Sequence, residues 1–233
     1  MSPAVTCRGI SKRYAASGAS PLTVLGDVDL TLHFGRLSVL MGPSGSGKTT
    51  LMRIASCIAA PDTGEVTVMG RKVAALSPEE RARLRARHFG FAFQEPRLFD
   101  ALTAIENVLV GLAISGHVGA DATRRAEQAL AMTDIVDRAA SYPRELSGGQ
   151  KQRVALARAL AGERGILFCD EPTASLDAAA ASDIAALLRR LVESHGCAAL
   201  IVSHDRRFLS VAHDGFSLQD GRLASLDTEG AGA

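Results

Sequence analysis

Apolar stretches long enough to cross a bilayer are missing from the 233-residue sequence, since a membrane-spanning helix needs about 20 consecutive apolar residues. Residues 1–14 also lack the apolar core of a signal peptide. Internal repeats are absent, and so is any linker long enough to separate two folds. If the protein acts at a membrane, we therefore expect it to do so through a membrane-spanning partner.

Cysteine is scarce and scattered. None of the four cysteines belongs to a CxxC pair, and no cluster of histidines accompanies them. Neither a metal site nor a disulfide framework built on cysteine is therefore expected. We expect buried free thiols in a reducing cytosol, at Cys7, Cys57, Cys169 and Cys197.

An excess of charge of either sign is also lacking. Lys and Arg number 26 and Asp and Glu number 25, so the formal net charge is +1. This balance gives no reason to expect a nucleic acid or an anionic membrane surface as partner. A run of alternate arginines is interpreted as a mostly solvated helix face rather than a nucleic-acid site; it consists of Arg81, Arg83, Arg85 and Arg87.

What is present is the composition of an ordinary globular protein, with 47% hydrophobic and 22% charged residues. The length favours one domain, 1–233. Compact apolar runs at 37–41, 166–170 and 198–202 predict buried strands. Residues 100–160 are rich in Ala, Leu and Arg, which predicts helices. Together these patterns predict an α/β fold with a helical subdomain, about 99–160, inserted into its core.

Other elements are predicted from local patterns. The N-terminal region alternates apolar and polar residues, which predicts an antiparallel strand pair with a small-residue turn at 15–21. Helical spacing after residue 47 predicts a helix at 48–60, with Leu51, Ile54, Ala55 and Ile58 on one side. Further strands are expected at 65–69, 215–218 and 222–224, helices after the N-cap Ser77 and at 178–194, and a frayed tail at 228–233.

A glycine-rich loop between a predicted strand and a predicted helix fits G-x-x-x-x-G-K-[ST] in full, from Gly42 to Thr49. The glycines let backbone N–H groups converge on phosphate oxygens, and the following helix adds its positive N-terminal end. Lys48 would reach the β- and γ-phosphates, and the Thr49 hydroxyl would ligate Mg²⁺. The predicted nucleotide cradle consists of Gly42, Pro43, Ser44, Gly45, Ser46, Gly47, Lys48, Thr49 and Thr50.

A pair of carboxylates follows the predicted strand at 166–170. Asp170 at the strand end would hold Mg²⁺, directly or through water. Glu171 would polarise a water for attack on the γ-phosphate. Two adjacent carboxylates suit hydrolysis better than transfer to a bulky acceptor, although a P-loop kinase or GTPase is an alternative that the P-loop alone leaves open.

The segment Leu146-Ser-Gly-Gly-Gln150 resembles the signature motif of ABC ATPases, and the sequence after it continues that family's helix. Ser147, Gly148 and Gly149 would expose a hydroxyl and N–H groups at a helix N-terminus, which makes a second anion site. One chain cannot easily use two γ-phosphate sites on one ATP. A head-to-tail partner can, because each signature would then cap the ATP held by the other chain.

The remaining motifs of that family occur in order, and the resemblance implies their roles. Tyr14 is similar to the aromatic residue that stacks on adenine. Gln94 matches the glutamine that contacts Mg²⁺ or the attacking water and senses the membrane partner. Asp177 matches a loop that crosses the dimer interface. His204 matches the switch histidine that contacts the γ-phosphate and positions Glu171.

The resemblance, which spans about residues 3–225, implies an ABC ATPase core with an antiparallel β subdomain. It implies ATP and Mg²⁺ as cofactors, catalysis by Lys48, Gln94, Glu171 and His204, and a metal site of Thr49, Gln94 and Asp170. Trans contacts would come from Ser147, Gly148, Gly149, Gln150 and Asp177. The implied partners are a second ATPase subunit, as a homodimer, and an integral membrane permease, without nucleic acid, at the cytoplasmic face of the inner membrane.

Three finer features look like the lipoprotein-releasing, macrolide-exporter and cell-division group, which often transmits mechanical work. They are the short loop between Tyr14 and Val24, the segment 88–94 and the segment 102–108. Departures from the family's usual residues are Arg36, Phe168, Cys169 and the segment 174–177, and none of them removes a catalytic group. A soluble ABC ATPase of DNA repair, translation or iron–sulfur assembly is the alternative. The iron–sulfur assembly type is the strongest of these, because the interval before the signature is too short for a repair-type insertion and the chain has one cassette.

Overall fold

The computed structural model describes residues 2–16, 19–162 and 164–228. Its centre is a six-stranded sheet in the order β10-β9-β3-β8-β7-β6, in which β9, β3, β8, β7 and β6 run parallel and β10 is antiparallel to β9. The strands are β3 (Leu37–Met41), β6 (Phe89–Phe93), β7 (Ile166–Asp170), β8 (Ala198–Val202), β9 (Asp214–Gln219) and β10 (Arg222–Leu226). The three buried strands expected at 37–41, 166–170 and 198–202 are thus confirmed.

The central strands are apolar on both faces because both faces are covered. Along β8, Leu200 joins one apolar cluster, with α1 (Lys48–Ala55) and the second sheet. Its neighbour Ile201 joins another, with α5 (Gly148–Leu160), α6 (Ala178–His195) and α7 (Arg207–Val211). This alternation places the sheet between two hydrophobic layers.

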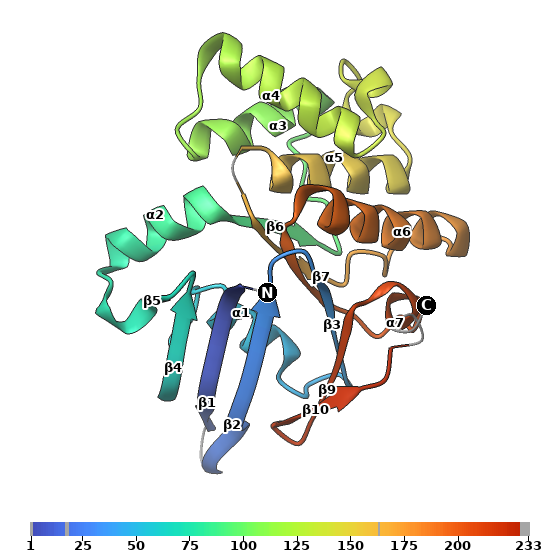
Figure 1. Cartoon of the computed structure of the whole chain (residues 1–233). Coiled ribbons are helices and arrows are strands. Elements are labelled where there is room, and N and C mark those ends of the chain that lie inside the picture. The colour runs from blue at the N-terminus through green and yellow to red at the C-terminus, as the bar shows by residue number, and fades with distance from the viewer. Residues whose placement is uncertain (1, 17–18, 163, 229–233) are drawn as a thin grey trace.

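A second, antiparallel sheet lies beside the first, at the lower left of Figure 1. Its order is β2-β1-β4-β5, with β1 (Pro3–Ala16), β2 (Ala19–His33), β4 (Thr63–Val68) and β5 (Arg71–Lys72). The predicted N-terminal antiparallel pair is therefore confirmed. The turn predicted at 15–21 is narrower than expected, because the strands extend to Ala16 and from Ala19, and residues 17–18 lie outside the described part of the chain.

Three helices gather into one layer at the top of Figure 1: α3 (Ala104–Ile114), α4 (Gly119–Met132) and α5. They enclose their own apolar cluster, which includes Val108, Leu130 and Val154. Single-turn helices η2 (Val136–Arg138) and η3 (Pro143–Glu145) connect α4 to α5. The helices predicted at 100–160 are confirmed, whereas the expectation that 99–160 acts as a subdomain stays a prediction. Of the tail predicted at 228–233, only residue 228 belongs to the described part of the chain.

The helix after the glycine-rich loop is shorter than predicted, since α1 ends at Ala55 rather than at residue 60. Cys57 adopts a left-handed conformation (φ 58°), and its N–H donates to Ile54 O at 3.0 Å. The N–H of Ile58 donates to Arg53 O at 2.8 Å, which completes a Schellman C-cap. The helix therefore stops before Ile58, whose side chain is 48% exposed instead of packed with the core.

Helix α2 (Pro78–His88) begins as predicted, because Ser77 and Glu80 form a capping box. The prediction of a solvated arginine face is only partly confirmed, because Arg83 and Arg87 are exposed whereas Arg81 and Arg85 are half-buried. Arg85 Nη1 donates to Cys57 O at 2.8 Å, so this arginine ties α2 to the turn after α1. A single-turn helix, η1 (Val73–Ala75), lies between β5 and α2 in the chain.

All four cysteines are free and buried, as predicted. Burial raises the pKa of Cys7 to about 12, with a further contribution from Cys57. Burial also raises the pKa of Cys197 to about 11. The thiols thus stay protonated at neutral pH.

Among residues 2–16, 19–162 and 164–228, no helix has the length and apolar character to cross a membrane.

Gly90 sets how closely β6 approaches α5. A Cβ at this position would lie 2.1 Å from Ala159 O, a backbone atom that cannot move aside by rotation. We expect Gly90→Ala to lower the free energy of unfolding by about 2–3 kcal/mol through overpacking, measured by urea denaturation. Gly26→Ala is the control, because a Cβ there meets nothing closer than 3.9 Å. Equal stability of the two variants would contradict the close approach.

Candidate active site

The carboxyl ends of four parallel strands reach the same edge of the central sheet. Cross-strand partners at this edge are Leu40 with Val202, Asp170 with Val202, and Phe93 with Asp170. Segments that leave β3, β8, β7 and β6 therefore start side by side. The predicted site residues that follow these strands, and are brought to this edge, are Gly42 to Thr49, His204, Glu171 and Gln94.

The glycine-rich loop occupies 42–47 between β3 and α1, as predicted. Gly42 has φ 147°, and a Cβ there would lie 2.3 Å from Leu218 O. Gly47 has φ 102°, and a Cβ there would lie 2.9 Å from Val24 O. Both positions combine a left-handed backbone with close neighbours, so only glycine fits.

Two features of this loop suit an anion. Lys48 Nζ folds over the loop and donates to Gly42 O and to Pro43 O, both at 2.8 Å. The buried Ser46 hydroxyl has no hydrogen-bond partner among the described residues. A buried hydroxyl without a partner is costly, and a bound phosphate oxygen would satisfy it. The loop, with 22–24, Asp220 and Gly221, lines a cavity of about 380 Å³.

Asp170 and its surroundings form a cluster of hard oxygen donors. Burial raises the pKa of Asp170, as does the neighbouring Glu171, whereas a hydrogen bond with Thr49 and the charge of Lys48 lower it. A cavity of about 490 Å³ is lined by Thr49, Gln94, Asp170 and Glu171, among others. Hydroxyl, amide and carboxylate oxygens are the ligands that Mg²⁺ accepts, and a cation would offset the cost of ionising the half-buried carboxylate.

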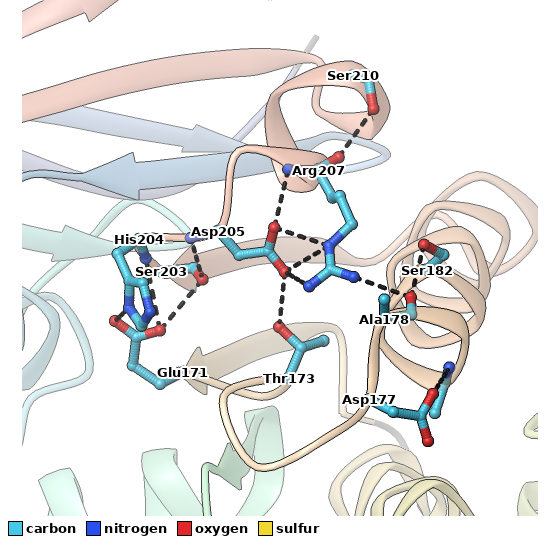
Figure 2. Close-up of polar contacts among 11 residues, drawn as sticks. Glu171, Thr173, Asp177, Ala178, Ser182, Ser203, His204, Asp205, Arg207 and Ser210 are labelled. Atoms are coloured by element: carbon cyan, nitrogen blue, oxygen red, sulfur yellow. Dashed lines mark hydrogen bonds and ion pairs between the residues drawn. The ribbon is translucent and has the colours of Figure 1, made fainter.

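Glu171 is held in one orientation by the loop after β8 (Figure 2). Its Oε1 lies 2.9 Å from His204 Nδ1, and its Oε2 accepts from the Ser203 hydroxyl at 3.2 Å and from His204 N at 3.4 Å. Because a carboxylate only accepts, Nδ1 of His204 carries the proton in this pair. The His204 side chain is 71% exposed, so its ring remains accessible to a ligand.

Backbone geometry aims the Glu171 side chain. Glu171 has φ 49°, a left-handed conformation that is uncommon for glutamate, and its N–H donates to Val202 O at 2.8 Å. This turn redirects the chain after Asp170. It thereby separates the two adjacent carboxylates, so that they face different partners.

Tyr14 lies on β1 opposite Leu22 of β2, and it is 44% exposed. Lys12 Nζ lies 5.8 Å from the centroid of its ring. Leu22 in turn lines the same cavity as the glycine-rich loop. Thr50 lies half-buried on the first turn of α1.

The segment at 147–150 is not brought to the site of its own chain, since none of the cavities around the loop, Asp170 or Glu171 is lined by it. Ser147 caps α5: its hydroxyl accepts from Gln150 N at 3.3 Å, and Gln150 Oε1 accepts from Ser147 N at 2.9 Å. A Cβ on Gly148 would lie 3.2 Å from Leu176, so this glycine also allows close packing. Asp177 caps α6 by accepting from Ala180 N at 2.9 Å.

Several polar residues at this edge were not predicted to act. Ser203 bridges Glu171 and the next loop, and a polar residue directly after a fully apolar strand is a signal that could have found it. Thr173, Asp205 and Arg207 form a linked group (Figure 2) that no sequence spacing indicates. Ser175 Oγ donates to Gln94 O at 3.2 Å, which ties the segment before Asp177 to the loop after β6.

Comparison with known proteins gives a consistent result. A family model described as ABC transporter matches residues 25–174. The macrolide export ATP-binding/permease protein MacB 1/2 of Paracoccus denitrificans (strain Pd 1222) is 40% identical over 232 residues, which are 99% of this chain but 34% of that protein. The chain thus spans about a third of the MacB-type relatives that it matches.

Other matches cover nearly the whole of both chains. The lipoprotein-releasing system ATP-binding protein LolD of Rhodopseudomonas palustris (strain BisB5) is 38% identical over 225 residues, 97% of each protein. A dimeric structure of the ATP-binding cassette MJ0796, in a post-hydrolysis state bound to ADP and Pi, has a TM-score of 0.84 and 34% identity, and the match covers 96% of this chain and 98% of that one. The chain belongs to the ABC transporter family.

Proposed function

We propose that this chain is the ATP-binding subunit of an ABC transporter, and that it hydrolyses ATP in a head-to-tail dimer to drive a membrane permease. The observation that carries the proposal is the sheet edge, where the glycine-rich loop, Asp170 and the Glu171–His204 pair come together. The similarity to a macrolide export protein, MacB, and to a lipoprotein-releasing protein, LolD, supports an export or mechanotransmission type.

ATP would lie along the loop at 42–47, with its phosphates on the backbone N–H groups and its adenine on Tyr14. Lys48 would exchange its bonds to Gly42 O and Pro43 O for phosphate oxygens. Mg²⁺, held by Thr49, Asp170 and Gln94, would supply charge neutralisation for the phosphates. The oxygen donors and the unpartnered Ser46 hydroxyl fit this ligand.

Hydrolysis would rely on Glu171. Its carboxylate, oriented by Ser203 and His204, would accept a proton from the attacking water. His204 would orient Glu171 through Nδ1–H, and a doubly protonated ring would also donate Nε2–H to a phosphate oxygen of the nucleotide. Fixing the base before the reaction lowers the entropic cost of reaching the transition state.

A second copy of the chain would complete the site. Ser147, Gly148, Gly149 and Gln150 lie at the N-terminus of α5, outside the cavities around the loop of their own chain. That helix end could therefore bind the phosphates of a nucleotide held by another copy of the chain, which supports a head-to-tail arrangement. The relative MJ0796 is described as dimeric.

The permease would dock in a groove between α2, β6, α3 and α5. This groove has a volume of about 380 Å³, and its lining includes Phe91, Phe93, Ile114 and Arg85. Gln94 directly follows β6, so a helix seated there would lie next to the nucleotide site. The helices at 99–160 would move with it as one subdomain, and the protein would sit at the cytoplasmic face of the inner membrane.

Replacement of the general base should separate binding from hydrolysis. Glu171→Gln keeps the size and polarity of the side chain but removes the proton acceptor, so we expect kcat for ATP to fall by about 10²-fold or more. ATP binding should persist and yield a stable ATP-bound dimer, measured by size-exclusion chromatography. Glu193→Gln is the control, because Glu193 pairs with Arg189 away from the site. Rapid turnover by Glu171→Gln would refute the role of Glu171.

Loss of the loop lysine should act on binding. Lys48→Ala removes a charge-assisted contact to phosphate, so we expect ATP affinity to fall about tenfold to a hundredfold, measured with a fluorescent ATP analogue. Lys72→Ala should bind ATP as the unaltered protein does, because Lys72 pairs with Glu65 on the other sheet. Unchanged affinity in Lys48→Ala would count against the phosphate cradle.

The permease is tested by capture from detergent-solubilised native membranes. Tagged Glu171→Gln protein with ATP should retain a permease with few membrane-spanning helices and a large extracytoplasmic domain, because the ATP-bound state persists in this variant. Tagged Lys48→Ala protein controls for capture that does not depend on ATP. Recovery of soluble proteins alone would overturn the transport role and make the iron–sulfur assembly type the leading alternative.

A further inference from the structure

A continuous group of hydrogen bonds joins the loop after β8 to the start of α6 (Figure 2). At its centre, Asp205 accepts from the buried Thr173 hydroxyl at 3.2 Å. It also accepts from Arg207 Nε at 2.9 Å on each of its two oxygens, and Arg207 Nη2 lies 2.8 Å from Oδ2. The carboxylate of Asp205 is therefore fixed from both sides.

Arg207 extends the group to a second segment. Its Nη1 donates to Ala178 O at 2.8 Å, in the first turn of α6 directly after Asp177. A guanidinium can bind a carboxylate and a carbonyl at once, because its donors point in fixed, divergent directions. Arg207 thus connects α6 to the loop that carries His204.

The same group reaches the proposed base. Asp205 N donates to the Ser203 hydroxyl at 3.1 Å, and that hydroxyl donates to Glu171 Oε2 at 3.2 Å. Ser203 is fully buried, so its hydroxyl has little freedom to turn elsewhere. The route from Ala178 to Glu171 is therefore unbroken. It runs from Ala178 O to the Arg207 guanidinium, then through Asp205 to the Ser203 hydroxyl, and ends at the Glu171 carboxylate.

The charges agree with this arrangement. Burial alone would raise the pKa of Asp205, but the hydrogen bonds and charge of Arg207, together with the Thr173 hydroxyl, lower it. In turn, Asp205 raises the pKa of Arg207, mainly through their hydrogen bond. The pair is thus ionised at neutral pH and keeps its geometry there.

We propose that Arg207 is a positioning residue for ATP hydrolysis, which holds the Ser203–His204 loop against α6 and so keeps Glu171 aimed. This inference rests on the proposed function. Within the described part of the chain, no hydrogen bond or ion pair joins Arg207 to Glu171, although both line one cavity of about 310 Å³. The bonded route between them therefore runs through Asp205 and Ser203. Asp205 itself is a poorer test, because its carboxylate also accepts from Arg207 N at 3.0 Å, so its loss would also disturb the backbone where α7 begins.

The test is steady-state ATP hydrolysis by the full chain with Arg207→Ala and Arg207→Lys. For Arg207→Ala we expect kcat to fall about tenfold, equivalent to about 1.4 kcal/mol, with KM and ATP affinity unchanged. A lysine ammonium can pair with Asp205 but lacks the planar fork with which Arg207 binds Asp205 and Ala178 O together, so Arg207→Lys should give an intermediate kcat. Full activity of Arg207→Ala, or a rise in KM without a fall in kcat, would overturn the proposal.

Arg189→Ala is a matched control, because Arg189 also joins α6 to α7 through a carbonyl, Val211 O at 2.8 Å, and a carboxylate, Glu193. It has no bond to the loop at 203–205 among those described, so its kcat should stay within twofold of the unaltered protein. A tenfold loss in Arg189→Ala as well would show that general weakening of this interface is responsible, and would refute a specific role for Arg207.

A double substitution tests the route. If Arg207 acts through Glu171, adding Arg207→Ala to Glu171→Gln should change the residual single-turnover rate by less than about twofold. A further tenfold loss would mean that Arg207 acts elsewhere, and would refute the proposal. The proposed function fails separately, if the unaltered protein does not hydrolyse ATP or if Glu171→Gln turns over rapidly.

Discussion

The parallel register of β3, β8, β7 and β6 is the constraint on which the whole site depends. Partners such as Asp170 and Val202 lie directly across from each other, and neighbouring strands are about 4.8 Å apart. Groups from four distant segments therefore meet without any long loop to carry them. A slip of one residue in β7 would exchange the faces of Asp170 and the buried Cys169, and would bury the carboxylate among apolar side chains.

Aromatic packing fixes this register at the β6–β7 boundary. Phe168 is the direct partner of Phe91, with ring centroids 5.7 Å apart, and it meets Phe89 edge-on at 5.3 Å. Phe168 is one of the departures from the family's usual residues that we noted in the sequence, and these contacts show how it is accommodated. Its side chain fills one face of β7, while Cys169 is fully buried on the other.

The sequence was sufficient for features encoded locally. The buried strands, the glycine-rich loop and the cap at Ser77 follow from short patterns, and the structure has them where predicted. The predicted end of α1 was wrong because Cys57 adopts a left-handed conformation, and the residue usually found in this conformation after a helix is glycine. The Thr173–Asp205 contact could not be predicted, since it joins residues 32 apart and exists only because β7 and β8 are in register.

Adjacent carboxylates at Asp170 and Glu171 repel each other, and burial adds to the cost of charging Asp170. The left-handed turn at Glu171 reduces this conflict by directing that side chain toward Ser203 and His204. Asp170 stays beside Thr49, where a cation would offset its charge. The proposed roles, metal binding by Asp170 and activation of water by Glu171, thus follow from the positive φ of Glu171 and from the hydrogen bonds that Ser203 and His204 make to its carboxylate. By the same reasoning, residues that do not contact the nucleotide would influence the proposed reaction if they keep the Glu171 carboxylate in this orientation.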